Sequence, residues 1–409
     1  MGRIPPDSSG MIAPHLLNAI AALPKADGAI YLDANASTRP LPEVVDLVAE
    51  IMRGGPANPS SAHWLGGDAR AHLERARDGV TSLLQGTLPE GVVFTSGGTE
   101  GNNAVLASHA KDGVRGTLIT TVVEHPSVIR PADRFARSGG NLITLPVSLD
   151  GRIDPGAVGA AVGGARGPVT LSVQWANSET GVTQPMADIV AEARRARQDV
   201  FIHSDVAQAI GRVALDLGST PVDVVTFSGH KLHAPHGIGA IILLDPDDRR
   251  LQALIVGGGQ ERGLRSGTPN VAGAAGLGLA ARLRASELAP VTQRLAMMRD
   301  SFERLVLDLV PKARVNGGGA PRVPNTSNIL FPGVEAMELI ARLDAAGIAC
   351  SAGSACSAAR PEPSHVLVAM GLSEDDAFSS VRFSYSLLNT LEEAERAARM
   401  IAQTVGEVA

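Results

Sequence analysis

Two kinds of hydrophobic pattern alternate along much of the chain. Short runs rich in apolar and β-branched residues are typical of buried strands. These runs are GVVFTSGG (91–98), TLITTVV (117–123), PVTLSVQWAN (168–177), DVFIHSD (199–205), VDVVTFSG (222–229) and GIGAIILL (237–244). Stretches with a helical period lie before or between them, such as 186–198, where apolar residues recur at i, i+3, i+4 and i+7 from Met186. This alternation predicts a mostly parallel sheet with helices on both faces.

The pattern changes after about residue 275. A long helical region rich in Ala, Leu and Arg covers 272–310, and a strand-like run, another helix and the segment with both cysteines follow. This change predicts a second, smaller α+β domain. We expect three parts: an N-terminal extension over 1–28, a large domain over 41–275, and a small domain formed by 29–40 with 276–409.

Composition and charge limit the partners. The 409 residues include 36 basic and 42 acidic side chains, giving a net charge of −6, and the absence of a dense basic block argues against direct nucleic-acid binding. No apolar run approaches the ~18 residues of a membrane span, and the first residues lack a secretory signal pattern. We therefore expect a cytoplasmic protein that does not bind membranes.

Polar residues follow several of the predicted strands where each strand ends. In α/β sheets, ligands bind beyond the carboxyl ends of the strands, so these residues indicate where a site lies. They are Thr95–Ser96, Glu124–His125, Asn177, Asp205 and Ser228.

The segment SGHKLHAPHGIG (228–239) places one lysine, Lys231, among three histidines spaced three residues apart. A metal site is one interpretation, but Pro235 and Gly237 break a helical face, and no cysteine or carboxylate ligand stands nearby, so we expect no metal. The other interpretations concern the lysine itself. It is either a solvated loop residue or a lysine in a dry cleft, where it loses its charge readily and forms a Schiff base.

Three other segments supply parts that one cofactor requires together. The strand, glycine turn and helix around Gly98 and Thr99 can hold an anion on backbone N–H groups, or can be a plain capped helix. Asp205 can hold a protonated ring nitrogen or cap a helix, and His125 can lie flat on a ring or be an ordinary loop histidine. Pyridoxal phosphate needs a lysine, a carboxylate, a phosphate cradle and a group over its ring.

The chain resembles the group I cysteine desulfurases, the type that serves nitrogenase and iron–sulfur cluster assembly, within the class V aminotransferase family. The resemblance runs from about residue 31 to the C-terminus. It implies the type I fold of pyridoxal-phosphate-dependent transferases, with a large domain built on a mostly parallel seven-stranded sheet and a smaller α+β domain. The matching motifs are YLDANASTR, ANPSSAHWLGGDAR, FTSGGTEGNN, VEHPSV, ANSETGVTQP, HSDVAQAIG, FSGHKLHAPHGIGA, GGGQERGLRSGTPN, GSACSAARPEPSHVL and SSVRFS.

The resemblance also assigns roles to residues of this chain. Lys231 would carry pyridoxal 5'-phosphate covalently, Asp205 would pair with its ring nitrogen, Gln208 would donate to its phenolic oxygen, and His125 would stack on the ring and help to move protons. The remaining implied cofactor contacts are Gly98, Thr99, Asn177, Ser228, His230 and, across a homodimer, Thr268. The implied substrate ligands are Asn35, Asn177 and Arg382.

Cys356 would be the nucleophile that takes sulfur from L-cysteine, leaves L-alanine and passes the persulfide sulfur to an acceptor protein. A nucleophilic thiol must first ionise, and a flexible loop of small residues such as SAGSACSAAR suits that task, although it also fits a plain surface loop. The only other cysteine, Cys350, resembles a small apolar residue, and a disulfide between the two would need a turn to bring them together.

Several alternatives share these residues. A selenocysteine lyase, or a desulfurase dedicated to DNA or tRNA sulfur modification, would use the same catalytic set. A non-catalytic scaffold would be expected to lack Lys231 or Cys356, and both are present. The sequence departs from the family at His236, where a lysine is common, at YSLLNT after the VRFS motif, and in the extension before residue 29. These departures leave the acceptor and the pathway open.

Overall fold

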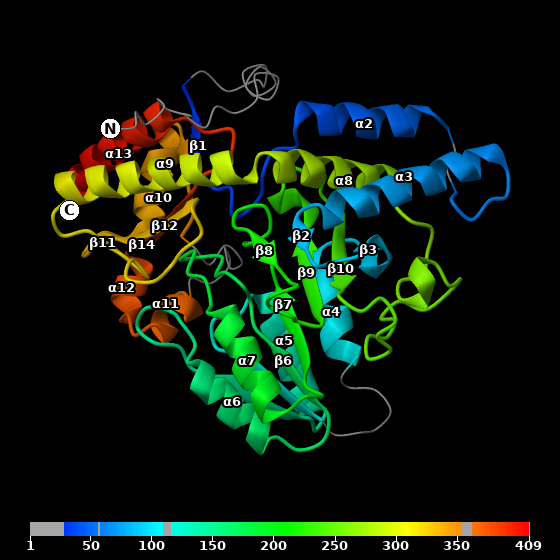
Figure 1. Cartoon of the computed structure of the whole chain (residues 1–409). Coiled ribbons are helices and arrows are strands. Elements are labelled where there is room, and N and C mark those ends of the chain that lie inside the picture. Colours follow the sequence, from blue (N-terminus) through cyan, green and yellow to red (C-terminus); the bar gives the residue numbers. More distant parts are fainter. Residues whose placement is uncertain (1–27, 56–57, 109–115, 353–361, 409) are drawn as a thin grey trace, which may run out of the picture.

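The computed structural model describes residues 28–55, 58–108, 116–352 and 362–408. Its centre is a seven-stranded sheet in the order β3-β10-β9-β7-β6-β4-β5, in which β10 is antiparallel to both neighbours and every other pair is parallel (Figure 1). The predicted mostly parallel sheet is confirmed. Its strands are β3 (Val92–Thr95), β4 (Thr117–Thr121), β5 (Asn141–Leu145), β6 (Val169–Ser172), β7 (Phe201–Asp205), β9 (Val224–Ser228) and β10 (Gly239–Leu243).

Burial explains why six of these strands were visible in the sequence. Every residue of β3, β4, β6 and β10 is buried, so both faces of the sheet are covered and these strands are rich in apolar and β-branched residues. The edge strand β5 is partly exposed along most of its length and carries a weaker pattern. The helices of this region are α2 (Pro42–Arg53), α3 (Trp64–Thr81), α4 (Gly98–Ser108), α5 (Pro126–Arg137), α6 (Pro155–Gly164) and α7 (Met186–Ala196).

A second, three-stranded antiparallel sheet lies in the C-terminal part, in the order β11-β12-β14. The short strand β1 (Ile30–Tyr31) pairs in parallel with β13 (Ile348–Ala349), which ties the start of the described chain to this part. The other elements here are β11 (Arg314–Val315), β12 (Thr326–Leu330), β14 (Ser380–Ser384), α9 (Leu288–Leu309), α10 (Ala336–Ala345), α11 (His365–Ala369), α12 (Glu374–Phe378) and α13 (Leu391–Val408).

Helices α8 (Val271–Ser286) and α9 follow each other almost end to end and bridge the two sheets along the top of Figure 1. The domain boundary predicted at residues 275–276 therefore falls inside a helix, and the division into domains stays a prediction. The single helical region expected over 272–310 is interrupted at Glu287, whose φ of −121° and ψ of 14° are not helical. Pro290 explains the break, because a proline ring clashes with the carbonyl four residues earlier.

Helices α3 and α8 cross with their backbones in close contact. A Cβ on Gly79 would lie 2.7 Å from the carbonyl carbon of Gly278, and a Cβ on Gly278 would lie 2.8 Å from the carbonyl oxygen of Ala76. Neither position can accept a methyl group unless the helices move apart. No helix of the described chain is both long enough and apolar enough to cross a membrane.

We expect Gly278→Ala to lower the free energy of unfolding by about 2 kcal/mol, because overpacking a close helix contact costs roughly 1–3 kcal/mol. Gly406→Ala in α13 is the matched control, since nothing lies within 4 Å of its added Cβ, and it should be neutral or stabilising by up to about 1 kcal/mol. Urea unfolding measures both variants. Equal stability changes would show that the α3–α8 contact is loose.

Candidate functional site

A cavity of about 330 Å³ lies at the carboxyl ends of the parallel strands. Sequence-predicted residues from several strands and from the chain after β1 meet there, as expected for the carboxyl edge of an α/β sheet. They are Asn35, Gly98, Thr99, His125, Asp205, Gln208, Ser228, His230, Lys231 and Arg382. Asn177 and Thr268 are not among the residues that line this cavity, and Cys356 lies outside the described residues.

The turn between β3 and α4 is the place where the sequence predicts an anion cradle. Helix α4 begins at Gly98, whose N–H donates to Ser228 Oγ at 2.7 Å, and the exposed Thr99 follows in the first turn. Glu100 is held away by its bonds to the Ser96 N–H at 2.9 Å and to Arg265 Nε at 3.0 Å. The N–H groups at the start of the helix and the two hydroxyls therefore suit a phosphate group.

The antiparallel strand β10 begins at the same edge of the sheet. A Cβ on Gly239 would lie 2.5 Å from the carbonyl oxygen of Phe227 and 2.6 Å from the Cα of Gly97. Only glycine fits there, and this close approach keeps the β3–α4 turn against the end of β9.

The amine of Lys231 is held by backbone carbonyls. It donates to the carbonyl oxygen of Asn35 and, at 2.7 Å, to that of Ala36. A carbonyl accepts a hydrogen bond but cannot compensate a positive charge as a carboxylate does. Burial lowers the pKa of Lys231 to about 7, and the guanidinium groups of Arg212 and Arg382 act in the same direction. This amine is therefore about half neutral near pH 7 and mostly neutral above pH 8.

Asp205 is fixed by two hydrogen bonds at the end of β7. Its Oδ1 accepts the N–H of Ala207 at 2.9 Å, and its Oδ2 accepts from Asn102 Nδ2 at 2.7 Å. The same amide donates to Ser127 Oγ at 2.8 Å, and Ser127 Oγ lies 2.7 Å from His125 Nδ1. Asn102 thus connects the carboxylate and the histidine.

A buried polar chain fixes the orientation of that amide. Thr226 donates its hydroxyl to Asn102 Oδ1 and lies 2.9 Å from Nε2 of the buried His203, whose Nδ1 is 2.9 Å from Ser172 Oγ. Burial lowers the pKa of His203 to about 4, so the ring is neutral. With its oxygen occupied by Thr226, Asn102 presents its NH₂ group to Asp205.

His125 stands at the start of α5 and lines the cavity. Its Nδ1 accepts the N–H of Ser127 at 3.1 Å, which leaves the proton of a neutral ring on Nε2. Burial lowers the pKa of His125, and Lys231 acts in the same direction, while Asp205 opposes both. The ring is therefore neutral at pH 7.

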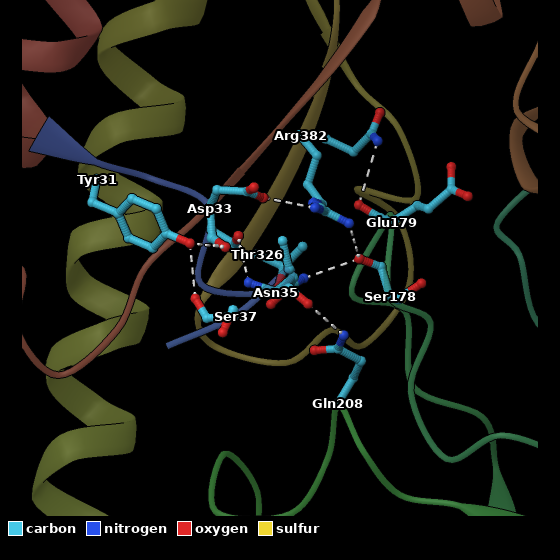
Figure 2. Close-up of polar contacts among 12 residues, drawn as sticks. Tyr31, Asp33, Asn35, Ser37, Ser178, Glu179, Gln208, Thr326 and Arg382 are labelled. Atoms are coloured by element: carbon cyan, nitrogen blue, oxygen red, sulfur yellow. Dashed lines mark hydrogen bonds and ion pairs between the residues drawn. The ribbon is translucent and has the colours of Figure 1, made fainter. Parts of the chain in front are cut away.

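Figure 2 shows Asn35 at the centre of the contacts that join β1 to the rest of the site. Its Nδ2 donates to Ser178 O at 3.0 Å and to Thr326 Oγ1 at 2.9 Å, and its carbonyl also accepts from Gln208 Nε2 at 3.1 Å. Its side chain therefore positions the chain, and its carbonyl faces the lysine.

Arg382 lies beside this hub and is almost fully buried. Its Nη2 pairs with Asp33 Oδ1 at 2.7 Å and its Nη1 donates to Ser178 O at 3.1 Å (Figure 2). Its Nε has no hydrogen-bond partner in the described chain. A buried cation with an unsatisfied donor at the cavity wall is suited to a carboxylate.

Asn177 is buried beneath the loop after β6. Its Oδ1 accepts the N–H groups of Glu179 and Thr180 at 2.9 and 3.0 Å, and its Nδ2 donates to Val123 O at 3.1 Å. This side chain shapes the loop that carries Ser178. A direct contact with cofactor or substrate stays a prediction.

Two buried acids line the cavity: Glu124, which the sequence placed at the end of a predicted strand without a role, and Glu179, which the sequence reasoning missed. Glu124 accepts the N–H of Gln174 at 3.0 Å, and Glu179 accepts the hydroxyl of Ser364. Burial raises the pKa of Glu124 to about 8 and raises that of Glu179. Both follow buried strands, which is a weak signal, but their partners lie on other elements. His365, another missed residue, lines the cavity with its Nε2 3.0 Å from Glu124 O.

The three histidines near Lys231 have separate partners. His230 and His236 stack with their centroids 5.1 Å apart and both contact Ser37 Oγ, while His233 Nδ1 lies 2.7 Å from Arg39 O. Among the described residues, no group of three or more histidine, cysteine and acidic side chains is arranged to hold a metal ion.

A buried lysine, a helix start suited to phosphate and a fixed carboxylate line one cavity, and this combination is typical of pyridoxal-phosphate sites on folds of this class. The residues present fit that cofactor. The chain belongs to the family described as aminotransferase class-V, which it matches over residues 30–397.

Named relatives agree with this placement. The protein named cysteine desulfurase NifS from Azotobacter vinelandii is 37% identical over 380 residues, which cover 93% of each chain. The solved structure of a NifS-like protein superposes with a TM-score of 0.84 at 30% identity, covering 93% of this chain and 100% of that one. The structure of SspA in complex with cysteine has a TM-score of 0.75 at 30% identity and covers 87% of this chain and 98% of that one.

We expect the pH at which Lys231 becomes reactive to lie near 7 in the cofactor-free protein, because its amine loses its proton there. Below pH 6 the amine is mostly protonated and slow to react, and above pH 8 it is mostly neutral and nucleophilic. Timed modification with a small amine reagent, followed by peptide mass spectrometry, measures the midpoint. The exposed Lys312 is the internal reference for a solvated amine. The same pH dependence at both lysines would contradict the depressed pKa.

Proposed function

We propose that this protein is a pyridoxal-phosphate-dependent cysteine desulfurase that converts L-cysteine to L-alanine and collects the sulfur as a persulfide on Cys356. The observation that carries the proposal is the buried amine of Lys231, which shares one cavity with Asp205 and Arg382. Relatives named as cysteine desulfurases support the same reaction.

The residues of the cavity divide into those that would hold the cofactor and those that would hold the substrate. The N–H groups at the start of α4, with Thr99, Ser228 and His230, would take the phosphate. Asp205 would keep the ring nitrogen protonated, since Asn102 and Ala207 fix its carboxylate. When bound, the cofactor supplies an electron sink for the α-carbon of the substrate.

Arg382 is the residue that would bind the substrate carboxylate. Its free Nε can donate to an incoming carboxylate while Asp33 and Ser178 hold the other nitrogens in place. This arrangement would fix the amino acid with its amine toward Lys231.

Lys231 and His125 would move the protons. Because the pKa of Lys231 is about 7, the released amine can take a proton and return it near neutral pH. His125, neutral with its proton on Nε2, would stack on the ring and can donate a hydrogen bond from that N–H, and it would pass a proton on only after gaining one to become the imidazolium form.

The sulfur step requires the thiolate of Cys356. The thiolate attacks the sulfur of bound cysteine, an S–S bond forms, and the Cβ–S bond breaks. The electron pair of the broken bond stays with the substrate carbon, which takes a proton and leaves as alanine. Cysteine and one enzyme thiol thus give alanine and one enzyme persulfide, so the atoms balance.

We infer a cytoplasmic homodimer that passes its sulfur to an acceptor protein, for iron–sulfur clusters or another sulfur-containing product. A second copy is favoured by exposed apolar residues near Thr268, namely Leu254, Ile255 and Val256, of which Val256 is 78% exposed. In a homodimer, Thr268 would reach the phosphate cradle of the partner.

Two substitutions separate the roles of cofactor and thiol. Lys231→Ala is expected to lose the protein-bound cofactor absorbance and to reduce alanine release by roughly 10³-fold or more, because no other lysine lines the described cavity. Cys356→Ala should keep the absorbance but form no persulfide. Absorbance spectra, alanine release and persulfide labelling measure these effects.

Cys350→Ala is the matched control for the thiol. Burial raises the pKa of Cys350 to about 12, with Asp33 acting in the same direction, so its thiol does not ionise near neutral pH and the variant should keep its turnover. Normal persulfide formation by Cys356→Ala would contradict the assigned nucleophile. Comparing L-cysteine with L-selenocysteine separates a desulfurase from a selenocysteine lyase.

A further inference from the structure

A second, smaller cavity of about 30 Å³ lies behind Lys231, away from Asp205 and the anion cradle. A polar cavity needs roughly 10–15 Å³ to hold one water-sized species, so this one has room for a single small ligand. It lies between the loop after β7, α8, α9 and the end of β14. Its lining residues are Thr38, Gly211, Arg212, Lys231, Leu232, His233, Arg284, Leu295, Asn325, Tyr385, Ser386 and Leu387.

Two side chains that line this cavity each carry a buried polar atom with no hydrogen-bond partner in the described structure. These atoms are Arg284 Nη1 and Tyr385 Oη, on side chains that are 7% and 1% exposed. A buried polar group without a partner costs roughly 1–3 kcal/mol, so two such groups at one cavity indicate a ligand that satisfies both. Both groups can donate a hydrogen bond.

The cavity is also cationic. Arg212, Arg284 and Lys231 line it, and none of the lining residues given above carries a carboxylate. The side chains of these arginines donate to neutral acceptors, Gln208 for Arg212 and the carbonyl of Gly211 for Arg284. Buried charges are normally paired, and these cations lack a negative partner within the cavity.

The pKa values of the two arginines agree with the lack of a carboxylate in the cavity lining. Burial lowers the pKa of Arg212 to about 9, and burial lowers that of Arg284 to about 9 as well. Arg284 and Arg382 lower the pKa of Arg212 further, and Arg294 lowers that of Arg284 further. Glu287 opposes the shift at Arg284 but does not line the cavity.

We propose that this cavity binds one small inorganic anion of halide size, such as chloride, between Arg284 Nη1 and Tyr385 Oη. An anion accepts from both donors and compensates the surrounding cations. A water molecule would have to direct its own hydrogens toward those cations or find acceptors elsewhere. The anion also lies next to Lys231, so its presence stabilises the protonated amine.

The anion would bind the cofactor-free protein as well as the enzyme. In a desulfurase, the site would link the ionisation of Lys231 to the concentration of a simple anion. The charged groups that act on Lys231 are Arg212 and Arg382, which favour the neutral amine, and Asp33 and Asp205, which oppose them.

Bromide in place of chloride locates the ion directly. Crystals of the full chain grown with sodium bromide should give an anomalous diffraction peak between Arg284 Nη1 and Tyr385 Oη. A water molecule alone at that place, with bromide bound elsewhere on the surface, would overturn the proposal.

Thermal unfolding in two salts of equal ionic strength provides the second test. Sodium methanesulfonate supplies an anion too bulky for a halide site, and sodium chloride supplies the proposed ligand. The wild-type Tm should be higher in chloride by roughly 2–4 °C, because a ligand that binds only the folded state stabilises it. This difference should disappear in Arg284→Met and shrink in Tyr385→Phe.

Tyr385→Phe gives the sharpest comparison. If the hydroxyl faces an empty cavity, its removal is neutral or stabilising in both salts; if it holds an anion, the variant loses stability in chloride alone. Tyr31→Phe and Arg304→Met, both exposed positions, are the matched controls and should keep the full chloride effect. An equal chloride effect on the Tm of Arg284→Met, Tyr385→Phe and the wild type would contradict the site. If Arg284→Met does not fold, the comparison of Tyr385→Phe with the wild type alone decides the question.

Discussion

The site depends on one constraint, a primary amine that is buried without a carboxylate hydrogen-bonded to it. Lys231 donates to the carbonyls of Asn35 and Ala36, which fix its position but leave its charge uncompensated. With Arg212 and Arg382 nearby, the amine loses its proton near pH 7 instead of near its ordinary value. A neutral lysine is the form that attacks an aldehyde. Chemistry on this lysine therefore follows from the absence of a direct counter-charge.

The fold creates this setting by bringing distant segments to one edge. The carboxyl ends of β3, β4, β7 and β9 supply the cradle, the histidine, the carboxylate and the lysine. The chain just after β1 then closes the site from the side of the second sheet. Asp33 and Arg382, 349 positions apart, form an ion pair at 2.7 Å. The contacts that hold the lysine thus depend on how the small sheet meets the large one, which makes the α8–α9 bridge part of the site's support.

The sequence predicted the sheet and most of the cavity because buried strands and the polar residues after them are local patterns. It could not show how polar groups pair across elements. The amide of Asn102 is oriented by Thr226 and donates to Asp205, which lies 103 positions away. The sequence also could not show that the side chain of Asn177, predicted to contact the ligand, holds the loop after β6. The arginines behind Lys231, whose cavity is lined by no carboxylate among the described residues, look like ordinary helix and turn residues in the sequence, and only burial distinguishes them.

The central claim is that Lys231, and no other lysine, carries the cofactor. Wild-type protein incubated with pyridoxal phosphate near pH 8, reduced with borohydride and digested, can be mapped by mass spectrometry. We expect the pyridoxyl mass on the peptide that contains Lys231, with the other lysine peptides unmodified. A label on another lysine, or no label at all, would contradict the claim.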